Sequence, residues 1–545
     1  MAKSQRQPRP EPWASYAPLP RLTVTFERGV NENTTPDIAE CSAGYNFDLS
    51  INQTSFVARK AFDLKATAPN GLPLTGLLQL VKRDGSESTL TVNGDRVYLW
   101  NGASTFTSKA TVISPAKLRS VYWSLGEYLV ITDVSATNVV KTWDGVTFAD
   151  IVTGLAKPLR AKYAIVQLNR IWLFNITYDG VSYPHMILAS AFENPLSYDT
   201  STRGGPSTVG GGTFATGLEA FFLLVPDMRP INGVCLFQNT LLISTMEGRL
   251  WNLTGTSAKD FGFVDFFDAE PSVGSECVTN IGNDVVFVSR GGEINNLMAT
   301  QSFGNVRTYS LSRWIPQTTH DIVPRKIIYD QQNQRVLFFL PDQILVLFKD
   351  LLAVAGVEGV KSPWSFYRTV DPALFNTQDA RYMYRPGTKE FTVFFGDALG
   401  RIYDLDGTGA VDAGLYGITV FRRTRHIGPD IMNKTPWPWV EENITGRIRY
   451  KRLSPIDATV TLEWENEYNQ ASTTVSMKGP GVLDVSPYWN GDSYWSGTDY
   501  WNGGFDATGQ TTSININPGG KGPGFFMDIS LTASSPFEVI SVEFD

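Results

Sequence analysis

Short apolar runs that alternate with polar residues, separated by tight polar turns, recur along most of the chain. The clearest example is Leu90 to Gly102, where two such runs flank Asn93-Gly94 and the second run ends in Trp-Asn-Gly. Strand side chains alternate between two faces and Asn-Gly accepts a positive φ, so this stretch predicts a β-hairpin turning at Asn93-Gly94. Similar stretches follow at 121–133, 163–174, 233–251, 277–294, 327–347 and 382–403.

A single hairpin cannot bury its own apolar faces, so the recurrence predicts small sheets that stack radially. We therefore expect an all-β protein with a β-propeller of about six to eight degenerate blades over residues 71–412. The spacing is interrupted near 188–230, which predicts a loop insertion there. Longer strands in 413–545 predict a β-sandwich platform, to which strands in 21–70 are expected to contribute. Residues 1–20 are rich in proline and predict an extended arm.

Two alternating runs on either side of a Ser-Pro-Ile-Asp sequence at 454–457 predict a hairpin within this sandwich. Pairing about its centre would set Arg449 opposite Glu463 and Arg447 opposite Glu465, with apolar side chains on the other face. We interpret these four residues as structural ion pairs on a solvent-exposed face. The alternative is that the arginines form a nucleic-acid-binding patch.

Small residues dominate Thr200 to Gly217 and cannot form a core. The stretch predicts a loop that projects from the scaffold. It is either a plain surface loop or a gate that reaches a channel or a partner. The candidate gate residues are Gly204, Gly205, Gly210, Gly211 and Gly212, because glycine permits large backbone rearrangements.

A Tyr-Trp-x-Gly sequence occurs three times between Tyr488 and Gly504, inside a Gly-rich insertion at 486–524. Aromatic side chains offer a large contact area at low entropic cost, and such a run left in water would be adhesive. It packs on its own sandwich or a second copy, docks another protein, or stacks on sugars. The candidate docking residues are Tyr488, Trp489, Tyr494, Trp495, Tyr500 and Trp501.

Composition narrows the function classes. Charged residues make up 18% of the chain, the formal net charge is -8 and the pI is about 5.2. An acidic chain disfavours a protein that grips nucleic acid through many phosphates, although DNA could pass it without being held. The three cysteines form no disulfide framework and are expected to be buried neutral thiols in a protein assembled in a reducing cytoplasm. The N-terminal stretch lacks the apolar core of a secretory signal, and no apolar run is long enough to span a membrane.

Catalytic and metal-binding motifs do not stand out. His185, His320 and His426 lie far apart in the sequence, so we expect no histidine metal site and no catalytic residues. The sequence from Asp404 to Gly409 faintly suggests a calcium loop, but Leu415 stands where a bidentate glutamate is needed. A turn that closes a blade is the better interpretation. We expect no cofactor, and enzyme activity is the least favoured class.

A segment near the N-terminus adds a family resemblance. Phe26 to Pro36 leads into Asn46-Phe47-Asp48-Leu49-Ser50 and then Phe56-Val57-Ala58-Arg59. This order is similar to the opening pattern of the tail nozzle proteins of short-tailed bacteriophages, also called tail tubular protein B. The propeller-like hairpins, the C-terminal sandwich and the spaced Tyr-Trp run also resemble this family.

The resemblance implies a virion protein that forms a hexameric ring at the distal end of a short tail. Its partners would be the tail adaptor above it and tail fibre, spike or needle proteins around it, and double-stranded DNA would pass through it during ejection. It would be assembled in the bacterial cytoplasm. An acidic wall agrees with this role, because a lumen that attracted phosphates would retard ejection. The alternative is a receptor-binding or glycan-binding propeller, with a polysaccharide-degrading enzyme as a further possibility.

Overall fold

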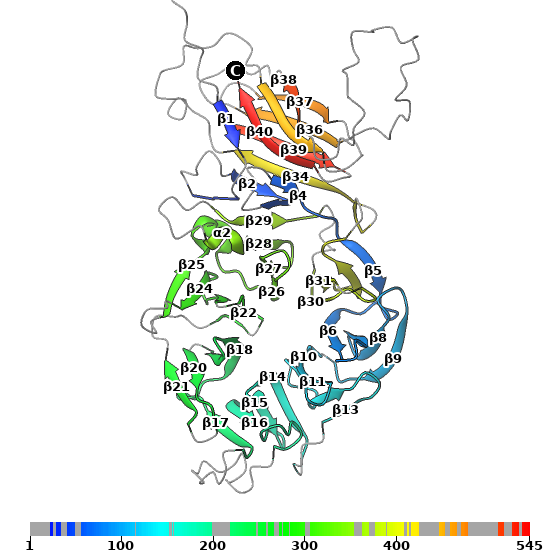
Figure 1. Ribbon diagram of the computed structural model, residues 1–545, viewed down its shortest axis with the longest axis vertical. Helices are drawn as coiled ribbons and strands as arrows, with labels where there is room; N and C mark the ends of the chain where they lie inside the picture. Colours follow the sequence, from blue (N-terminus) through cyan, green and yellow to red (C-terminus); the bar gives the residue numbers. More distant parts are fainter. Residues whose placement is uncertain are drawn as a thin grey trace, which may run out of the picture.

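A computed structural model shows a nearly all-β protein with a propeller and a platform of two further sheets (Figure 1). The structure describes residues 22–25, 29–33, 41–49, 56–198 and 218–424, together with the strands at 446–452, 458–465, 470–477, 511–516, 526–533 and 537–544. Within these ranges it leaves out 115, 152–154, 156, 247–248, 258–259, 266–271, 275, 283, 300–305, 354–361, 370–375, 389, 408–410 and 414–415. Short helical turns η2 (Ser312–Trp314), α1 (Pro316–Thr319) and α2 (Lys349–Ala353) interrupt the strands. None of the described helices is long and apolar enough to cross a membrane.

The propeller has seven blades, each a four-stranded antiparallel sheet. The first blade contains β6 (Leu74–Val81), β7 (Glu87–Asn93), β8 (Arg96–Trp100) and β9 (Phe106–Thr111). The second contains β10 (Leu118–Trp123), β11 (Tyr128–Asp133), β12 (Lys141–Trp143) and β13 (Phe148–Asp150). The third contains β14 (Leu159–Gln167), β15 (Arg170–Tyr178), β16 (Val181–Ala189) and β17 (Phe221–Leu224). The fourth contains β18 (Ile231–Phe237), β19 (Thr240–Thr245), β20 (Leu250–Thr254) and β21 (Gly262–Asp265).

The fifth blade contains β22 (Val278–Asn280), β23 (Val285–Val288), β24 (Ile294–Ala299) and β25 (Val306–Ser310). The sixth contains β26 (Lys326–Asp330), β27 (Arg335–Phe339), β28 (Ile344–Phe348) and β29 (Trp364–Tyr367). The seventh contains β30 (Asp379–Tyr384), β31 (Phe391–Gly396), β32 (Arg401–Asp404) and β5 (Asp63–Thr67). Each of the seven recurring stretches in the sequence falls in one blade, so the predicted propeller is confirmed.

The hairpin at Leu90–Gly102 forms as β7 and β8, but its turn is one residue later than predicted. Asn93 pairs with Arg96, which leaves Gly94 and Asp95 as the two turn residues. Gly94 has a φ of 63°, as the first central position of a type II′ turn requires. Asn93 is instead a buried strand end whose amide Nδ2 donates to the backbone oxygen of Leu72 at 3.4 Å.

The ring is closed by a strand from the N-terminal part of the chain. β5 pairs antiparallel with β32, so the outermost strand of the seventh blade precedes the first blade in sequence. The predicted boundary at residue 70 is therefore wrong for residues 63–67, which belong to the propeller and not to the platform. The pairing joins the two ends of the propeller within one blade, so the ring cannot open without breaking the hydrogen bonds between β5 and β32.

Apolar clusters lie between successive blades. Leu78, Leu90 and Trp143 belong to the cluster between the first and second blades, and similar clusters follow around the ring. Each blade therefore covers the apolar face of its neighbour, as the repeated hairpin requires. The three cysteines are buried and form no disulfide, and burial raises the pKa of both Cys235 and Cys277 to about 12.

The platform contains strands from both ends of the chain. One six-stranded sheet contains β3 (Phe47–Leu49), β4 (Phe56–Ala58), β40 (Phe537–Phe544), β35 (Gly446–Arg452) and β38 (Thr511–Ile516), with β1 (Leu22–Thr25) paired to β40. The other contains β2 (Cys41–Tyr45), β34 (Tyr416–Thr424), β39 (Phe526–Ala533), β36 (Ala458–Glu465) and β37 (Gln470–Met477), with β33 (Val411–Asp412) paired to β34. The predicted contribution of N-terminal strands to the platform is confirmed.

The predicted pairing of Arg449 with Glu463 and of Arg447 with Glu465 is wrong. β35 pairs with β38 and β40, whereas β36 pairs with β37 and β39 in the other sheet. Two strands with the same alternation can form a hairpin or lie in opposite sheets of a sandwich, since both arrangements give each strand one core face. The sequence pattern could not distinguish these two arrangements.

The platform adjoins the sixth blade through its outer strand β29 (Figure 1). The backbone N–H groups of Gly29 and Val30 donate to the oxygens of Ser362 and Trp364 at 2.8 and 2.9 Å. The N–H of Asn46 donates to the oxygen of Phe366 at 2.6 Å. The platform is thus hydrogen-bonded to the edge of the propeller through the backbone.

A buried ion pair forms the second part of this joint. Arg59 and Asp412 are each about 1% exposed, and Arg59 Nη1 lies 2.8 Å from Asp412 Oδ1. Arg59 also donates from Nε to Asn46 Oδ1 at 2.9 Å and from Nη2 to the backbone oxygen of Arg368 at 3.0 Å. Asp412 Oδ2 contacts Arg59 Nη2, and Asp412 Oδ1 also accepts the backbone N–H of Phe62 at 2.9 Å. The guanidinium of Arg59 therefore joins the platform to the end of the sixth blade, and its partner Asp412 binds the residue that precedes β5 of the seventh.

We expect Gly29→Ala to destabilise the joint by about 3 kcal/mol, because the new methyl group would overpack it. A Cβ at this position would lie 1.9 Å from the carbonyl oxygen of Trp364 and 2.7 Å from its carbonyl carbon, and this backbone cannot move without losing its hydrogen bonds. Differential scanning calorimetry would measure the effect. Gly291→Ala is the matched control, since a Cβ there meets no atom within 4 Å. Equal unfolding temperatures for the two variants would contradict the close packing at Gly29.

Candidate functional site

The candidate site is the axial channel of the propeller. The first strands of the blades, β6, β10, β14, β18, β22, β26 and β30, each contact the next one around the ring and so enclose the axis. A cavity of about 430 Å³ lies among them and is lined by side chains from all seven, from Leu77 on β6 to Arg381 on β30. Cavities of this size hold small ligands in other proteins.

Charged side chains cross the channel at one level. Arg119 on β10 donates from Nε to Glu276 Oε1 at 2.8 Å, although Glu276 precedes the first strand of the fifth blade. Its Nη2 lies 3.0 Å from Asp379 Oδ1, which belongs to the seventh blade. Lys326 of the sixth blade contacts the other oxygen of Glu276. We call these four residues the channel ion cluster, and together they tie four blades to one another across the axis.

Backbone groups hold the cluster in place. Arg119 Nη1 donates to the backbone oxygens of Leu118 and Thr75 at 2.7 and 3.3 Å. Asp379 Oδ2 accepts the N–H of Leu77 at 2.9 Å, and Asp379 is only 2% exposed. The charged groups therefore have fixed positions, which is the condition for a buried ion pair to offset its desolvation cost.

Burial and mutual charge shift the pKa values in the channel. Burial alone would raise the pKa of Glu276, but Arg119, Lys326 and Lys117 hold it well below its usual range. Burial, together with repulsion from Arg119, lowers the pKa of Lys326 against the attraction of Glu276. Burial would also lower the pKa of Arg119, but Asp379 and Glu276 raise it. The neighbouring cations thus keep Glu276 ionised near neutral pH.

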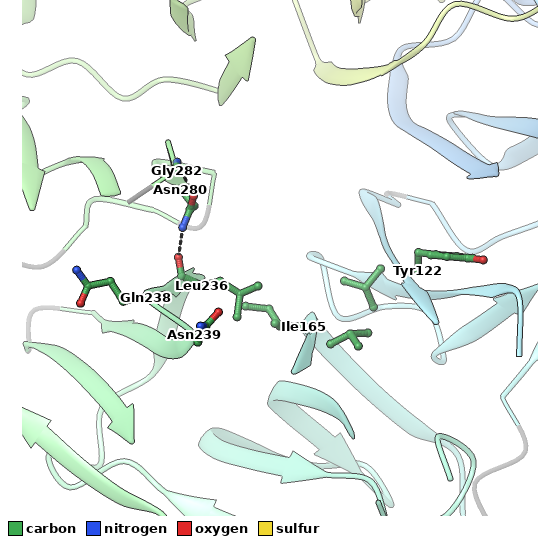
Figure 2. A pocket seen from close by; sticks show the side chains of 9 residues that line it. Tyr122, Ile165, Leu236, Gln238, Asn239, Asn280 and Gly282 are labelled. Carbon is green, nitrogen blue, oxygen red and sulfur yellow. Dashed lines mark hydrogen bonds between the residues drawn. The ribbon is translucent and has the colours of Figure 1, made fainter. Parts of the chain in front are cut away.

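A second cavity, of about 710 Å³, lies further along the same inner strands. On β10, Tyr122 lines this second cavity, whereas Ser120 lines the first. On β14, Ile165 lines the second cavity and Ala164 the first. Figure 2 shows Gln238, Asn239 and Asn280 on the opposite side from Tyr122 and Ile165. Asn280 Nδ2 donates to the oxygen of Leu236 at 2.6 Å. The channel is therefore charged at one level and lined by neutral amides and aromatic or apolar groups at the next.

The candidate gate and docking residues predicted from the sequence lie outside the residues that the structure describes. The candidate gate residues Gly204 to Gly212 lie outside the described residues, in the connection between β16 and β17 of the third blade. The aromatic run from Tyr488 to Trp501 also lies outside the described residues. Both assignments stay predictions.

A metal site in the described part of the chain would need several ligand side chains close together. No group of three or more His, Cys, Asp or Glu side chains there could hold a metal ion. Asp404, which begins the weak calcium-like sequence, ends β32, and its Oδ2 accepts from Arg385 Nε at 2.9 Å. Asp406 contacts Arg335. Arginines therefore use the carboxylates that a cation would need.

Sequence reasoning missed the channel ion cluster. Three of its members lie on the short first strands of their blades, whose other residues are mostly apolar: Arg119, Lys326 and Asp379. The neighbouring Arg381 is a further charged residue on such a strand. Once the repeats are aligned, a charge at this position marks a side chain near the axis. That signal was available in the sequence, but only after the blade boundaries were known.

Comparisons with known proteins do not assign this chain to a family. No family model and no curated protein matches the chain. Among solved structures, virginiamycin B lyase from Staphylococcus aureus aligns with a TM-score of 0.38 and 12% identity over 63% of this chain and 97% of that chain. YCF48 bound to D1 peptide aligns with a TM-score of 0.40 and 9% identity over 64% of this chain and 98% of that chain. At these values the likenesses carry no inference about activity or partners.

Proposed function

We propose that this protein is a structural subunit of the distal ring, or nozzle, of a short phage tail. The observation that carries the proposal is the joint between platform and propeller. Gly29, Val30, Asn46 and Arg59 belong to the segments that resemble the nozzle family, and all four make joint contacts. The resemblance thus rests on residues that fix the orientation of the two parts, which a wall-forming subunit requires.

The channel ion cluster is consistent with this role and adds a constraint. The contact between Arg119 and Glu276 spans the axis, so a nucleic-acid duplex cannot thread the propeller itself. In the proposed ring, DNA passes through a lumen between subunits, and the propeller is part of the wall around it. The net charge of -8 suits such a wall, because acidic surfaces do not hold phosphates.

A receptor-binding or glycan-binding propeller is the second candidate. The cavity of about 710 Å³ favours it, since the amide side chains Gln238 and Asn239 and the tyrosine Tyr122 are among the residues that line it. Amides and an aromatic ring can together bind the hydroxyl groups and apolar face of a sugar. This function requires no ring assembly.

The mass of the purified full-length protein separates the two functions. We expect native mass spectrometry and negative-stain microscopy to show a closed ring of about six copies, because symmetric closure satisfies identical interfaces in every subunit. The matched measurement is saturable binding of bacterial surface oligosaccharides to the same sample. A stable monomer or trimer that binds such sugars would refute the nozzle proposal and support the second candidate.

A further inference from the structure

Arg381 lies in the axial channel with part of its guanidinium unused. It is on β30, next to the channel ion cluster, and it lines the cavity of about 430 Å³. Its Nη1 donates to Ser120 Oγ at 2.9 Å and to the backbone oxygen of Leu77 at 3.1 Å. Within the described part of the chain, its Nε and Nη2 have no hydrogen-bond partner. The edge that carries these two parallel donors is therefore unoccupied by the described residues, on a residue that lines the cavity.

Neighbouring carboxylates do not neutralise Arg381. Asp379 lies two positions away and attracts it, but the oxygens of Asp379 are already engaged by Leu77 and Arg119. Among the residues that the structure describes, no carboxylate forms an ion pair with Arg381. Burial lowers the pKa of Arg381, against the attraction of Asp379.

Positive charge also exceeds negative charge in the surroundings. Arg119, Lys326 and Arg381 line the cavity with only two carboxylates, those of Glu276 and Asp379. A fourth cation, Lys117, lies close enough to lower the pKa of Glu276. A third carboxylate, Asp133, acts on Arg119, but its oxygens accept bonds from Lys117, Ser135 and Asn138 backbone N–H groups. The cations outnumber the carboxylates even when Asp133 is counted, within a protein that is acidic overall.

We propose that the axial channel binds a compact oxyanion, a phosphate or carboxylate group, on the free edge of Arg381. The Nε and Nη2 donors of a guanidinium match two oxygens of such a group, and charge-assisted bonds of this kind are the stronger ones. An added negative charge would balance the excess of cations around Arg119 and Lys326. The volume of about 430 Å³ leaves room for the small molecule that carries the group. This inference does not depend on the proposed nozzle function.

Titration of the full-length protein with inorganic phosphate, and separately with acetate, tests the proposal. Isothermal calorimetry at pH 7.5 and constant ionic strength should show saturable binding of at least one of these probes, and the better probe identifies the group. Arg381→Gln should weaken that binding by about tenfold or more, because it removes both the charge and the two-donor edge. The matched control is Arg249→Gln, since Arg249 is half exposed and pairs with Asp265 away from the channel.

Three outcomes would overturn the proposal: no saturation by either probe, equal binding by Arg381→Gln, or an equal loss in Arg249→Gln. If Arg381→Gln lowers the unfolding temperature, Arg381→Lys takes its place. Lysine keeps the charge but cannot present two parallel donors, so we expect weaker binding with the fold retained. Unchanged affinity in a folded Arg381→Lys protein would exclude the bidentate edge. Ring assembly is measured separately, so its failure and the failure of this site are distinguishable.

Discussion

Replacing Asp412 with alanine should lower the free energy of unfolding by about 3–5 kcal/mol, the usual cost of leaving one partner of a buried ion pair alone. Arg59 would keep its charge at about 1% exposure and lose both carboxylate contacts. The N–H of Phe62 would lose its acceptor as well. Guanidinium-induced unfolding, followed by tryptophan fluorescence, measures the change, and Trp364 at the joint gives a local signal.

Two further variants make this test specific. Asp179→Ala is the matched control, because Lys157 and Asp179 are 55% and 60% exposed and 3.6 Å apart, and such pairs contribute about 1 kcal/mol or less. Arg59→Met combined with Asp412→Leu should recover much of the loss, since it removes the isolated charge and keeps the volume. If Asp412→Ala unfolds no more easily than Asp179→Ala, the buried pair does not hold the joint.

Replacing Glu276 with glutamine should destabilise the propeller by about 3 kcal/mol near neutral pH, because it leaves Arg119 and Lys326 without their shared carboxylate. The pKa of Glu276 is lower in the folded protein than its ordinary value of 4.5. Its stabilising contribution is therefore complete above that value and declines as the pH falls below it. The difference in unfolding free energy between wild type and Glu276→Gln should be largest above about pH 5 and shrink toward pH 3.

Denaturant titrations at several pH values measure this difference. Glu390→Gln provides the control, since Glu390 is 65% exposed in its pair with Arg385 and should contribute about 1 kcal/mol or less at any pH. A pH-independent difference between wild type and Glu276→Gln would show that Glu276 stabilises the channel through packing and not through its charge.

The fold could be predicted because hairpin signals are local. Alternation and turn residues lie within a dozen positions, so each of the seven blades left a recognisable stretch in the sequence, including the one at Leu90–Gly102. Pairings between distant strands leave no such trace. β5 follows no hairpin pattern of its own and meets β32 only in the folded ring. The assignment of β35 and β36 to separate sheets depends on partners such as β40, which the local pattern does not specify.

The channel site escaped prediction for a related reason. Arg119, Glu276 and Asp379 are isolated charges in three different blades, and the sequence spacing between them carries no motif. Only closure of the ring brings them together across the axis. Motifs such as a phosphate loop are found in sequence because one turn holds all the ligands, whereas this cluster is a product of topology.

Strand pairing between the two ends of the chain has a consequence for biosynthesis. A ribosome releases β1 and β5 well before their partners β40 and β32, and the pairing of Leu22 with Phe544 joins residues that are far apart in the sequence. The earliest strands must therefore wait with unpaired edges while the intervening blades are made, which favours chaperone binding and slow final folding. A prematurely terminated chain lacks β40 and leaves β1, β4 and β35 without a common partner. This sheet of the platform therefore forms only after β40 has been synthesised, so its folding is linked to a late step of translation.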